Sequence, residues 1–225
     1  PGAVLQAAGI APVAERAGVG ANLWEHPRVT LEFARAPSYM HRMLRWDRLV
    51  LGFAQAVALR SGPATWPLVA AHLFLASSEE RSAPDFQVLL RLFDPTLQPW
   101  LRRAPVADRW GMVVCLVQPD SRGYVRAVSN DAMQAPEIVT GILREGSDVA
   151  RLVRVCRALR NAMAAPELAG WTDKEMAPGN DVSSDADWER YVRETGDTIF
   201  HPGGTCAMGS VVDHRLALYG VSGLR

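Results

Sequence analysis

Short runs of apolar residues, several of them alternating with polar positions, predict that much of the chain forms strands. In residues 28–34 the apolar side chains Val29, Leu31 and Phe33 occupy every second position, which is typical of a strand with one polar face. β-Branched and aromatic residues are frequent in further runs, which we predict to be strands as well. These runs are residues 68–76, 85–93, 110–118 and 123–129.

Helical periodicity is clearest in residues 147–164, where apolar side chains recur three or four positions apart. The recurring residues are Val149, Leu152, Val153, Cys156, Leu159 and Met163. A second helix is predicted over residues 185–195, because Ser184 can cap its first turn together with Asp187 three residues on.

The remaining segments complete the expected fold. Residues 42–60 are apolar enough to predict a helix, and residues 3–8 read as the end of a helix that Gly9 stops. Residues 170–182 are rich in glycine, proline and aspartate and predict a loop, whereas residues 220–225 read as the beginning of a strand. The segments between the strands are long and show no βαβ rhythm. We therefore expect an α+β fold, a mainly antiparallel sheet with helices packed on one face.

Composition limits the classes of partner. The chain has 225 residues, 48% of them apolar and 21% charged, which is enough for one large core or two small ones. Lysine plus arginine and aspartate plus glutamate number 24 each, so no long-range attraction to nucleic acid or to an anionic membrane is expected. No run approaches the roughly 18 unbroken apolar residues of a membrane span. We expect a small-molecule substrate, no nucleic-acid partner and no membrane span.

Cysteines and histidines give no sign of a disulfide framework or a metal site. Cys115, Cys156 and Cys206 are far apart, odd in number and without a C-x-x-C pairing, which fits a reducing, cytoplasmic location. The histidines lack the i, i+4 spacing of a helix-borne zinc site. The sequence also lacks a G-x-G-x-x-G turn after a strand, a nucleotide P-loop and a G-x-S-x-G nucleophile elbow.

Residues 200–209, FHPGGTCAMG, form the segment with the clearest chemical character. His201 precedes a proline and is therefore pushed out of helical conformation, while Gly203 and Gly204 let the backbone approach something flat or bulky. A loop of this kind can present an imidazole at the face of a cofactor. Taken alone, however, a single histidine before a glycine-rich turn is more often structural.

Five motifs in a fixed order favour a functional role for His201, because together they resemble the glucose–methanol–choline (GMC) oxidoreductase family of flavoproteins. Residues 1–12 resemble the family's second signature, and residues 18–27, GVGANLWEHP, resemble its G-V-G-x-N-L-x-D-H-P. Residues 119–125 resemble P-x-S-R-G-x-V, and Glu175 with the Pro-Gly at 178–179 resembles E-x-x-P-G. Residues 201–209 match H-P-x-G-T-C-x-M-G, and residues 211–213 and 220–225 match the family's continuation of that motif. Departures are Ala8 and Ala11 in the second signature and Glu25 in place of Asp.

The resemblance implies an FAD-dependent alcohol oxidase or dehydrogenase that oxidises a CH–OH group by hydride transfer to the flavin. It makes His201 the active-site base and brings Gly203, Gly204 and Thr205 close to the cofactor, although the glycines also suit an ordinary turn. His26, between an acid and a proline, is interpreted as fixing a loop. Two alternatives remain open. One is a non-redox family member such as a hydroxynitrile lyase, and the other is a truncated, non-catalytic binding or assembly module.

The same resemblance predicts the domain organisation. Residues 1–27 would be a remnant of the FAD domain or linker region, residues 28–198 a substrate-binding domain, and residues 199–225 the catalytic loop and the start of a C-terminal FAD-domain segment. The family's phosphate loop would precede Pro1, and its second active-site residue would follow Arg225. Both ends therefore read as cuts through a longer protein. We expect that this chain alone does not retain FAD, and that it pairs with a complementary FAD-binding polypeptide segment or self-associates.

Overall fold

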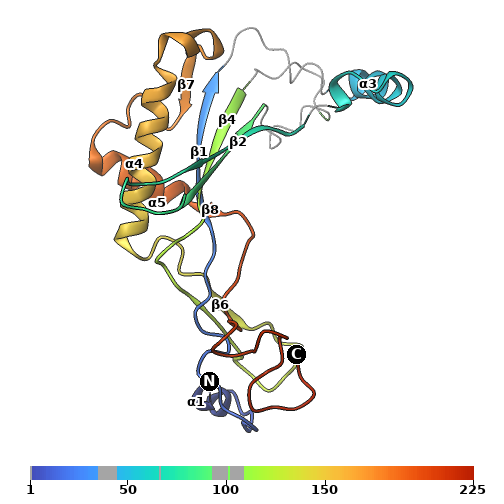
Figure 1. The fold of residues 1–225 in the computed structure, drawn as a ribbon, viewed down its shortest axis with the longest axis vertical. Helices are drawn as coiled ribbons and strands as arrows, with labels where there is room; N and C mark the ends of the chain where they lie inside the picture. The colour runs from blue at the N-terminus through green and yellow to red at the C-terminus, as the bar shows by residue number, and fades with distance from the viewer. Residues whose placement is uncertain (1, 35–44, 66, 93–100, 102–108) are drawn as a thin grey trace. The chain divides into compact units, whose positions relative to one another are not determined.

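The chain is organised as two compact units, each built from separate stretches of sequence (Figure 1). The computed structural model describes residues 2–34, 45–65, 67–92, 101 and 109–225. The first unit comprises Pro1–Pro27, Val117–Asp148 and Asp197–Arg225, and the second comprises Arg28–Leu116 and Val149–Gly196. These breaks lie near two of the expected boundaries, but the segment 117–148 joins the two terminal segments in the first unit. Which unit binds substrate and which binds flavin stays a prediction.

An antiparallel sheet is the centre of the second unit, as expected for an α+β fold. Its strands are β1 (Pro27–Ala34), β2 (Val69–Leu75), β3 (Phe86–Arg91), β4 (Arg109–Leu116) and β7 (Lys174–Ala177). Their order is β2-β3-β4-β1-β7, and each neighbouring pair is antiparallel. The strands predicted from residues 28–34, 68–76, 85–93 and 110–118 are confirmed, each within a few residues.

Two helices supply the other half of this core. α4 (Gly146–Met163) and α5 (Asp185–Thr195) lie on the same side of the sheet (Figure 1). Buried side chains come from alternate positions of β1 and from the apolar faces of both helices. They include Val29, Leu31, Phe33, Leu152, Cys156, Trp188 and Val192. The predicted cap of α5 is confirmed, because Ser184 Oγ accepts from the backbone N–H of Asp187 in a complete capping box.

Strand β7 corrects the expectation of a loop over residues 170–182. Its sequence, KEMA, has no β-branched residue, but Glu175 pairs with Phe33 of β1 and so adds an edge strand to the sheet. Arg160 of α4 donates hydrogen bonds to both carboxylate oxygens of Glu175. The N–H of Gly179 also donates to this carboxylate, at 3.1 Å. Tertiary pairing and one ion pair, rather than local preference, make this segment a strand.

The second unit contains further helices outside these two layers. α3 (Trp46–Leu59) confirms the helix predicted within residues 42–60, of which residues 42–44 lie outside the described part. Its apolar side chains are between 60% and 84% exposed at positions Val50, Leu51, Phe53, Val57 and Leu59. The second unit also contains the 3-10 helices η1 (Pro63–Thr65) and η3 (Pro166–Trp171).

The first unit has little regular structure. α1 (Gly2–Ala7) confirms the predicted helix end, and β8 (Asp197–Thr198) is very short. β5 (Tyr124–Arg126) realises the strand expected within residues 123–129, but it pairs with β6 (Glu137–Val139) in a small sheet of its own.

Residues 220–225 form turns, which corrects the expected terminal strand. Gly220 and Gly223 have φ angles of +78° and +82°, and this left-handed conformation cannot continue an extended strand. The apolar residues Val221 and Leu224 suggested a strand, but the local conformation of the two glycines prevents one.

A buried carboxylate connects the sheet to α4 in the second unit. The side chain of Asp85 is fully buried and accepts hydrogen bonds from the backbone N–H and the hydroxyl of Ser77, both at 2.7 Å. Arg81 and Arg151 reach the same carboxylate at 3.0 and 3.2 Å. Burial by itself would raise the pKa of Asp85, but these hydrogen bonds and positive charges outweigh it and lower the pKa below its usual 3.8.

We predict that Asp85→Asn lowers the free energy of unfolding by about 3 kcal/mol at neutral pH, because it removes the buried carboxylate that pairs with Arg151 and Arg81. The folded-state pKa of Asp85 is depressed, so its contribution is present above the unfolded value and is lost as the pH falls through the folded value. Urea denaturation between pH 7 and pH 2 should therefore show the two proteins converging in acid. A stability difference that stays constant over this range would contradict the assignment.

Candidate functional site

The loop that carries His201 is held against the segment before β1 by a short antiparallel bridge. The N–H of Trp24 donates to the carbonyl of Gly203 at 2.9 Å, and the N–H of Gly203 donates back to the carbonyl of Trp24 at 3.0 Å. The two segments are far apart in sequence, and the bridge fixes their register. It places residues 25 and 26 beside residue 201.

Glu25 joins the two histidine-bearing segments through one oxygen atom. Its side chain is buried, with 6% of the residue exposed. Its Oε1 accepts hydrogen bonds from the backbone N–H of His26 and from that of His201, both at 2.8 Å. The acid–His–Pro arrangement thus fixes a loop, as the sequence suggested, and the loop that it fixes includes His201.

The two imidazole rings of this pair lie against each other. His201 Nδ1 and His26 Nδ1 are 3.3 Å apart, and the ring planes meet edge to face at 77° with centroids 5.3 Å apart. The indole of Trp24 also lies edge to face with the His26 ring, with centroids 5.6 Å apart. Burial, helped by the nearby His201, lowers the pKa of His26 below 6.5, although the charge of Glu25 acts in the opposite direction. His201 itself is exposed and accessible to a small molecule.

Both glycines after His201 are required by packing within the chain. A Cβ on Gly203 would lie 2.9 Å from Nε1 of Trp24. Gly204 has a φ of +92°, and a Cβ there would lie 2.3 Å from the carbonyl oxygen of Asn22. Asn22 is in turn bound through its Oδ1 to Nε of Arg122 at 3.0 Å. This packing accounts for both glycines, and their predicted approach to a flavin stays a prediction.

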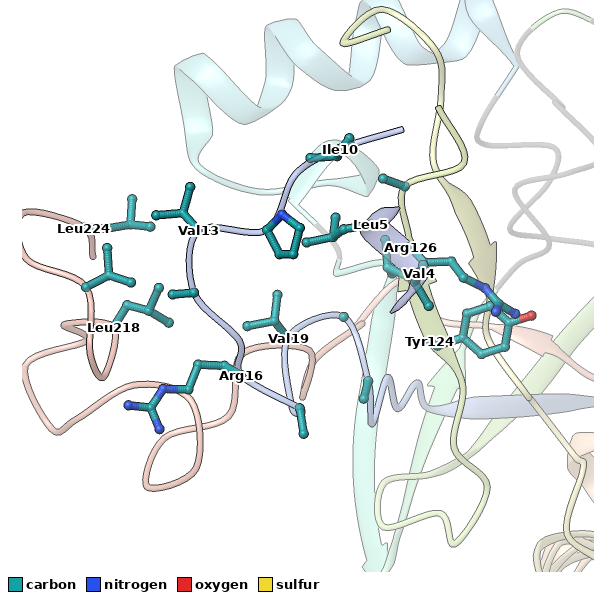
Figure 2. A pocket seen from close by; sticks show the side chains of 18 of the residues that line it. Val4, Leu5, Ile10, Val13, Arg16, Val19, Tyr124, Arg126, Leu218 and Leu224 are labelled. Carbon is teal, nitrogen blue, oxygen red and sulfur yellow. The ribbon is translucent and has the colours of Figure 1, made fainter. Parts of the chain in front are cut away.

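Two cavities lie within the first unit. One, of about 570 Å³, is lined by α1, the loop that follows it, β5 and the C-terminal turns, and most of its lining is apolar. Figure 2 shows Val4 and Leu5 on one side of it and Leu218 and Leu224 on another, with the Arg126 guanidinium stacked on Tyr124. The second cavity, of about 640 Å³, is lined in part by Thr205 and Cys206. Neither lining includes His26 or His201.

The cysteines do not extend this candidate site, and the described residues add neither a metal site nor a membrane-spanning helix to it. Cys115 and Cys156 are buried, and burial raises the pKa of the Cys115 thiol to about 11. Cys206 is an exposed free thiol. Among the described residues, no group of three or more His, Cys, Asp or Glu side chains could hold a metal ion. Within the same part of the chain, no helix is both long and apolar enough to cross a membrane.

Comparison with known proteins shows similarity to one family. The family model described as GMC oxidoreductase matches residues 119–225. An alcohol dehydrogenase [acceptor] of Pseudomonas putida is 31% identical, over 99% of this chain and 41% of its own length. An oxygen-dependent choline dehydrogenase of Serratia proteamaculans is 30% identical, over 100% of this chain and 41% of its own length. The chain is thus similar to GMC oxidoreductases along its whole length, and residues 119–225 match the model of that family.

Solved structures show that larger proteins contain the fold of this chain. A formate oxidase superimposes with a TM-score of 0.84 at 22% identity, covering 99% of this chain and 44% of that one. An FAD-dependent oxidoreductase from Chaetomium thermophilum superimposes with a TM-score of 0.80 at 19% identity, covering 100% of this chain and 46% of that one. The chain thus spans less than half the length of these relatives and structures.

The residues singled out from the sequence lie on one loop. Gly203 and Gly204 pack on the segment at 22–24, and the carbonyl of Thr205 accepts from the N–H of Gly20 at 2.9 Å. Sequence reasoning did not find the contact between the rings of His26 and His201, which are 175 positions apart. The G-V-G-x-N-L-x-D-H-P resemblance, which includes His26, was the available signal for it.

We predict that Glu25→Ala lowers the free energy of unfolding by about 2 kcal/mol, because two N–H groups lose their acceptor in a largely buried place. Glu25→Gln keeps an amide oxygen at the same position and should lose only about 1 kcal/mol. Urea denaturation of the two variants beside the unchanged protein measures the difference. Equal losses in the two variants would show that the side-chain oxygen is not the source of the stabilisation.

Proposed function

We propose that this chain is the part of an FAD-dependent oxidoreductase that binds an alcohol-type substrate and supplies the base, His201, for oxidation of a CH–OH group. The observation that carries the proposal is an exposed imidazole whose backbone is fixed by a buried carboxylate and whose ring rests on a second histidine. A general base must be both accessible and held in one orientation, and His201 meets both conditions. The alcohol and choline enzymes among the relatives support the substrate class.

The role of His201 is a proton transfer. The substrate O–H bond breaks, its proton passes to a ring nitrogen of His201, and the carbon that carried the hydroxyl becomes a carbonyl carbon as its hydride departs. FAD, when bound, supplies the acceptor for that hydride. A neutral imidazole is suited to this work near neutral pH, because its ordinary pKa lies close to 6.5.

The residues beside His201 fit one part of a flavin site. Thr205 and Cys206 border a cavity, and the turn at Gly203 and Gly204 holds the loop close to the unit's surface. These residues would lie next to the cofactor. The sequence contains no glycine-rich phosphate loop after a strand, so we propose that FAD binding requires polypeptide beyond these residues.

We propose a complementary flavin-binding segment as the partner of the first unit. The relatives have more than twice the matched length, and the first unit has a mostly apolar cavity of about 570 Å³. The motif resemblance supports residues 28–198 as the substrate-binding domain with flavin-domain segments on either side, although residues 117–148 within that range belong to the first unit. The lyase and the non-catalytic module remain formal alternatives, but no observation in the structure favours either one.

We predict that His201→Ala in the flavin-loaded enzyme lowers kcat by about 10²- to 10⁴-fold, the usual cost of a lost general base, and leaves the FAD content near normal. Turnover on a panel of primary alcohols and choline, together with bleaching of the flavin spectrum, measures both effects. His214→Ala, at an exposed histidine, is the matched control and should keep its turnover. A His201→Ala enzyme that retained most of its turnover would refute the role of base.

We also predict that the 225-residue chain, purified without further polypeptide, shows no stoichiometric flavin absorption after incubation with FAD and gel filtration. The physical reason is that dinucleotide affinity depends on a glycine-rich turn and a helix N-terminus that bind the phosphates. Light scattering on the same sample distinguishes a monomer from self-association. A stable one-to-one complex with FAD would overturn the prediction.

A further inference from the structure

We propose that His26 is a positioning residue for His201, and that its Nδ1 accepts a hydrogen bond from Nδ1–H of His201, which leaves Nε2 of His201 as the nitrogen that takes the substrate proton. The inference rests on the proposed function, because it refines how His201 acts as the base. It also assigns a role to a histidine that the sequence linked only to the shape of a loop.

The distance between the rings requires a division of roles. The two Nδ1 atoms are 3.3 Å apart, so one must donate and the other must accept. A neutral imidazole carries its proton on only one nitrogen. If His26 were the donor, His201 would carry its proton on Nε2 and could accept nothing there. His201 can act as a base at Nε2 only if its own Nδ1 carries the proton and His26 accepts it.

The surroundings of His26 favour the accepting role. Its ring is partly buried beside Trp24, and burial is the largest influence that lowers its pKa, followed by the nearby His201. The carboxylate of Glu25, the other charged group that acts on it, raises the pKa but is outweighed. His26 is therefore neutral near neutral pH and keeps a lone pair for His201. Protonation of His26 in acid would remove that lone pair and break the contact.

Backbone hydrogen bonds also fix the positions of the two histidines relative to each other. Glu25 Oε1 holds the backbone N–H groups of both histidines, each at 2.8 Å, so the two rings start from positions fixed by the same atom. The bridge between Trp24 and Gly203 fixes the register of the same two segments. The arrangement follows the logic of catalytic triads, in which a third group orients the imidazole that takes the proton.

The proton balance supports the same assignment. When the alcohol gives its proton to Nε2 and its hydride to the flavin, His201 becomes an imidazolium with protons on both nitrogens. The proton on Nδ1 continues to donate to the neutral His26, and this bond becomes stronger because its donor is now charged. His26 thus stabilises the protonated base without changing its own protonation.

The direct test is ¹⁵N NMR of the histidine rings in the unchanged 225-residue chain near neutral pH, with FAD absent. His201 should be the Nδ1–H tautomer. His72 provides an internal reference, because its Nδ1 lies 3.0 Å from Nε2 of Gln87, an amide nitrogen that can only donate, and so His72 should be the Nε2–H tautomer. If His201 were found as the Nε2–H tautomer, the proposal would be wrong.

Two variants extend the test to the flavin-loaded enzyme. His26→Leu removes the acceptor and should lower kcat about 10- to 100-fold with KM little changed, the usual cost of losing a partner that orients an active group. His26→Asn retains an oxygen close to the Nδ1 position and should restore most of kcat and the Nδ1–H tautomer of His201. His72→Leu is the control and should change neither.

The outcomes separate this inference from the proposed function. If His201→Ala abolishes turnover while His26→Leu changes neither kcat nor the His201 tautomer, the base assignment stands and the positioning role of His26 is refuted. If His201→Ala leaves turnover intact, the proposed function fails, and the NMR tautomer still decides whether the pair is bonded as described. Should His26→Leu fail to fold, His26→Asn and the unchanged chain supply both readouts.

Discussion

One carboxylate oxygen holds the candidate site together. Glu25 Oε1 accepts the backbone N–H groups of His26 and His201, which are far apart in sequence, and it does so from a buried position where no water competes strongly for it. The contact between the imidazoles, the exposure of His201 and the shape of the loop all depend on this junction. A buried charge costs free energy unless it is bonded, and the two amides supply those bonds.

The joining of the two segments by Glu25 also explains the glycines and the tryptophan of the same region. Once the two segments are joined, the backbone after His201 must pass directly over Trp24 and Asn22. Gly203 and Gly204 are the residues that allow it, because a Cβ at either position would collide with these neighbours. The glycine-rich turn beside His201 is thus explained by packing inside the chain. Any approach to a flavin would be an additional use of the same turn.

Local patterns in the sequence were sufficient where a segment's own residues decide its structure. The alternation in β1, the apolar stripe of α4 and the capping box at Ser184 are such cases. Local patterns did not predict the structure of segments whose conformation depends on a partner far away in the sequence. β7 is a strand because it pairs with β1 and because Arg160 binds Glu175. His26 and His201 are in contact because the bridge between Trp24 and Gly203 and the carboxylate of Glu25 join their two segments. The motif resemblance identified the family and the loop, but not the contact between the histidines.

The junction at Glu25 can be measured directly by amide hydrogen exchange at His26 and His201. If one oxygen holds both groups, the two amides should be protected to a similar extent in the unchanged chain, and both should exchange faster in Glu25→Ala. Rapid exchange at either amide in the unchanged chain would contradict the account. So would a variant in which only one of the two amides is affected.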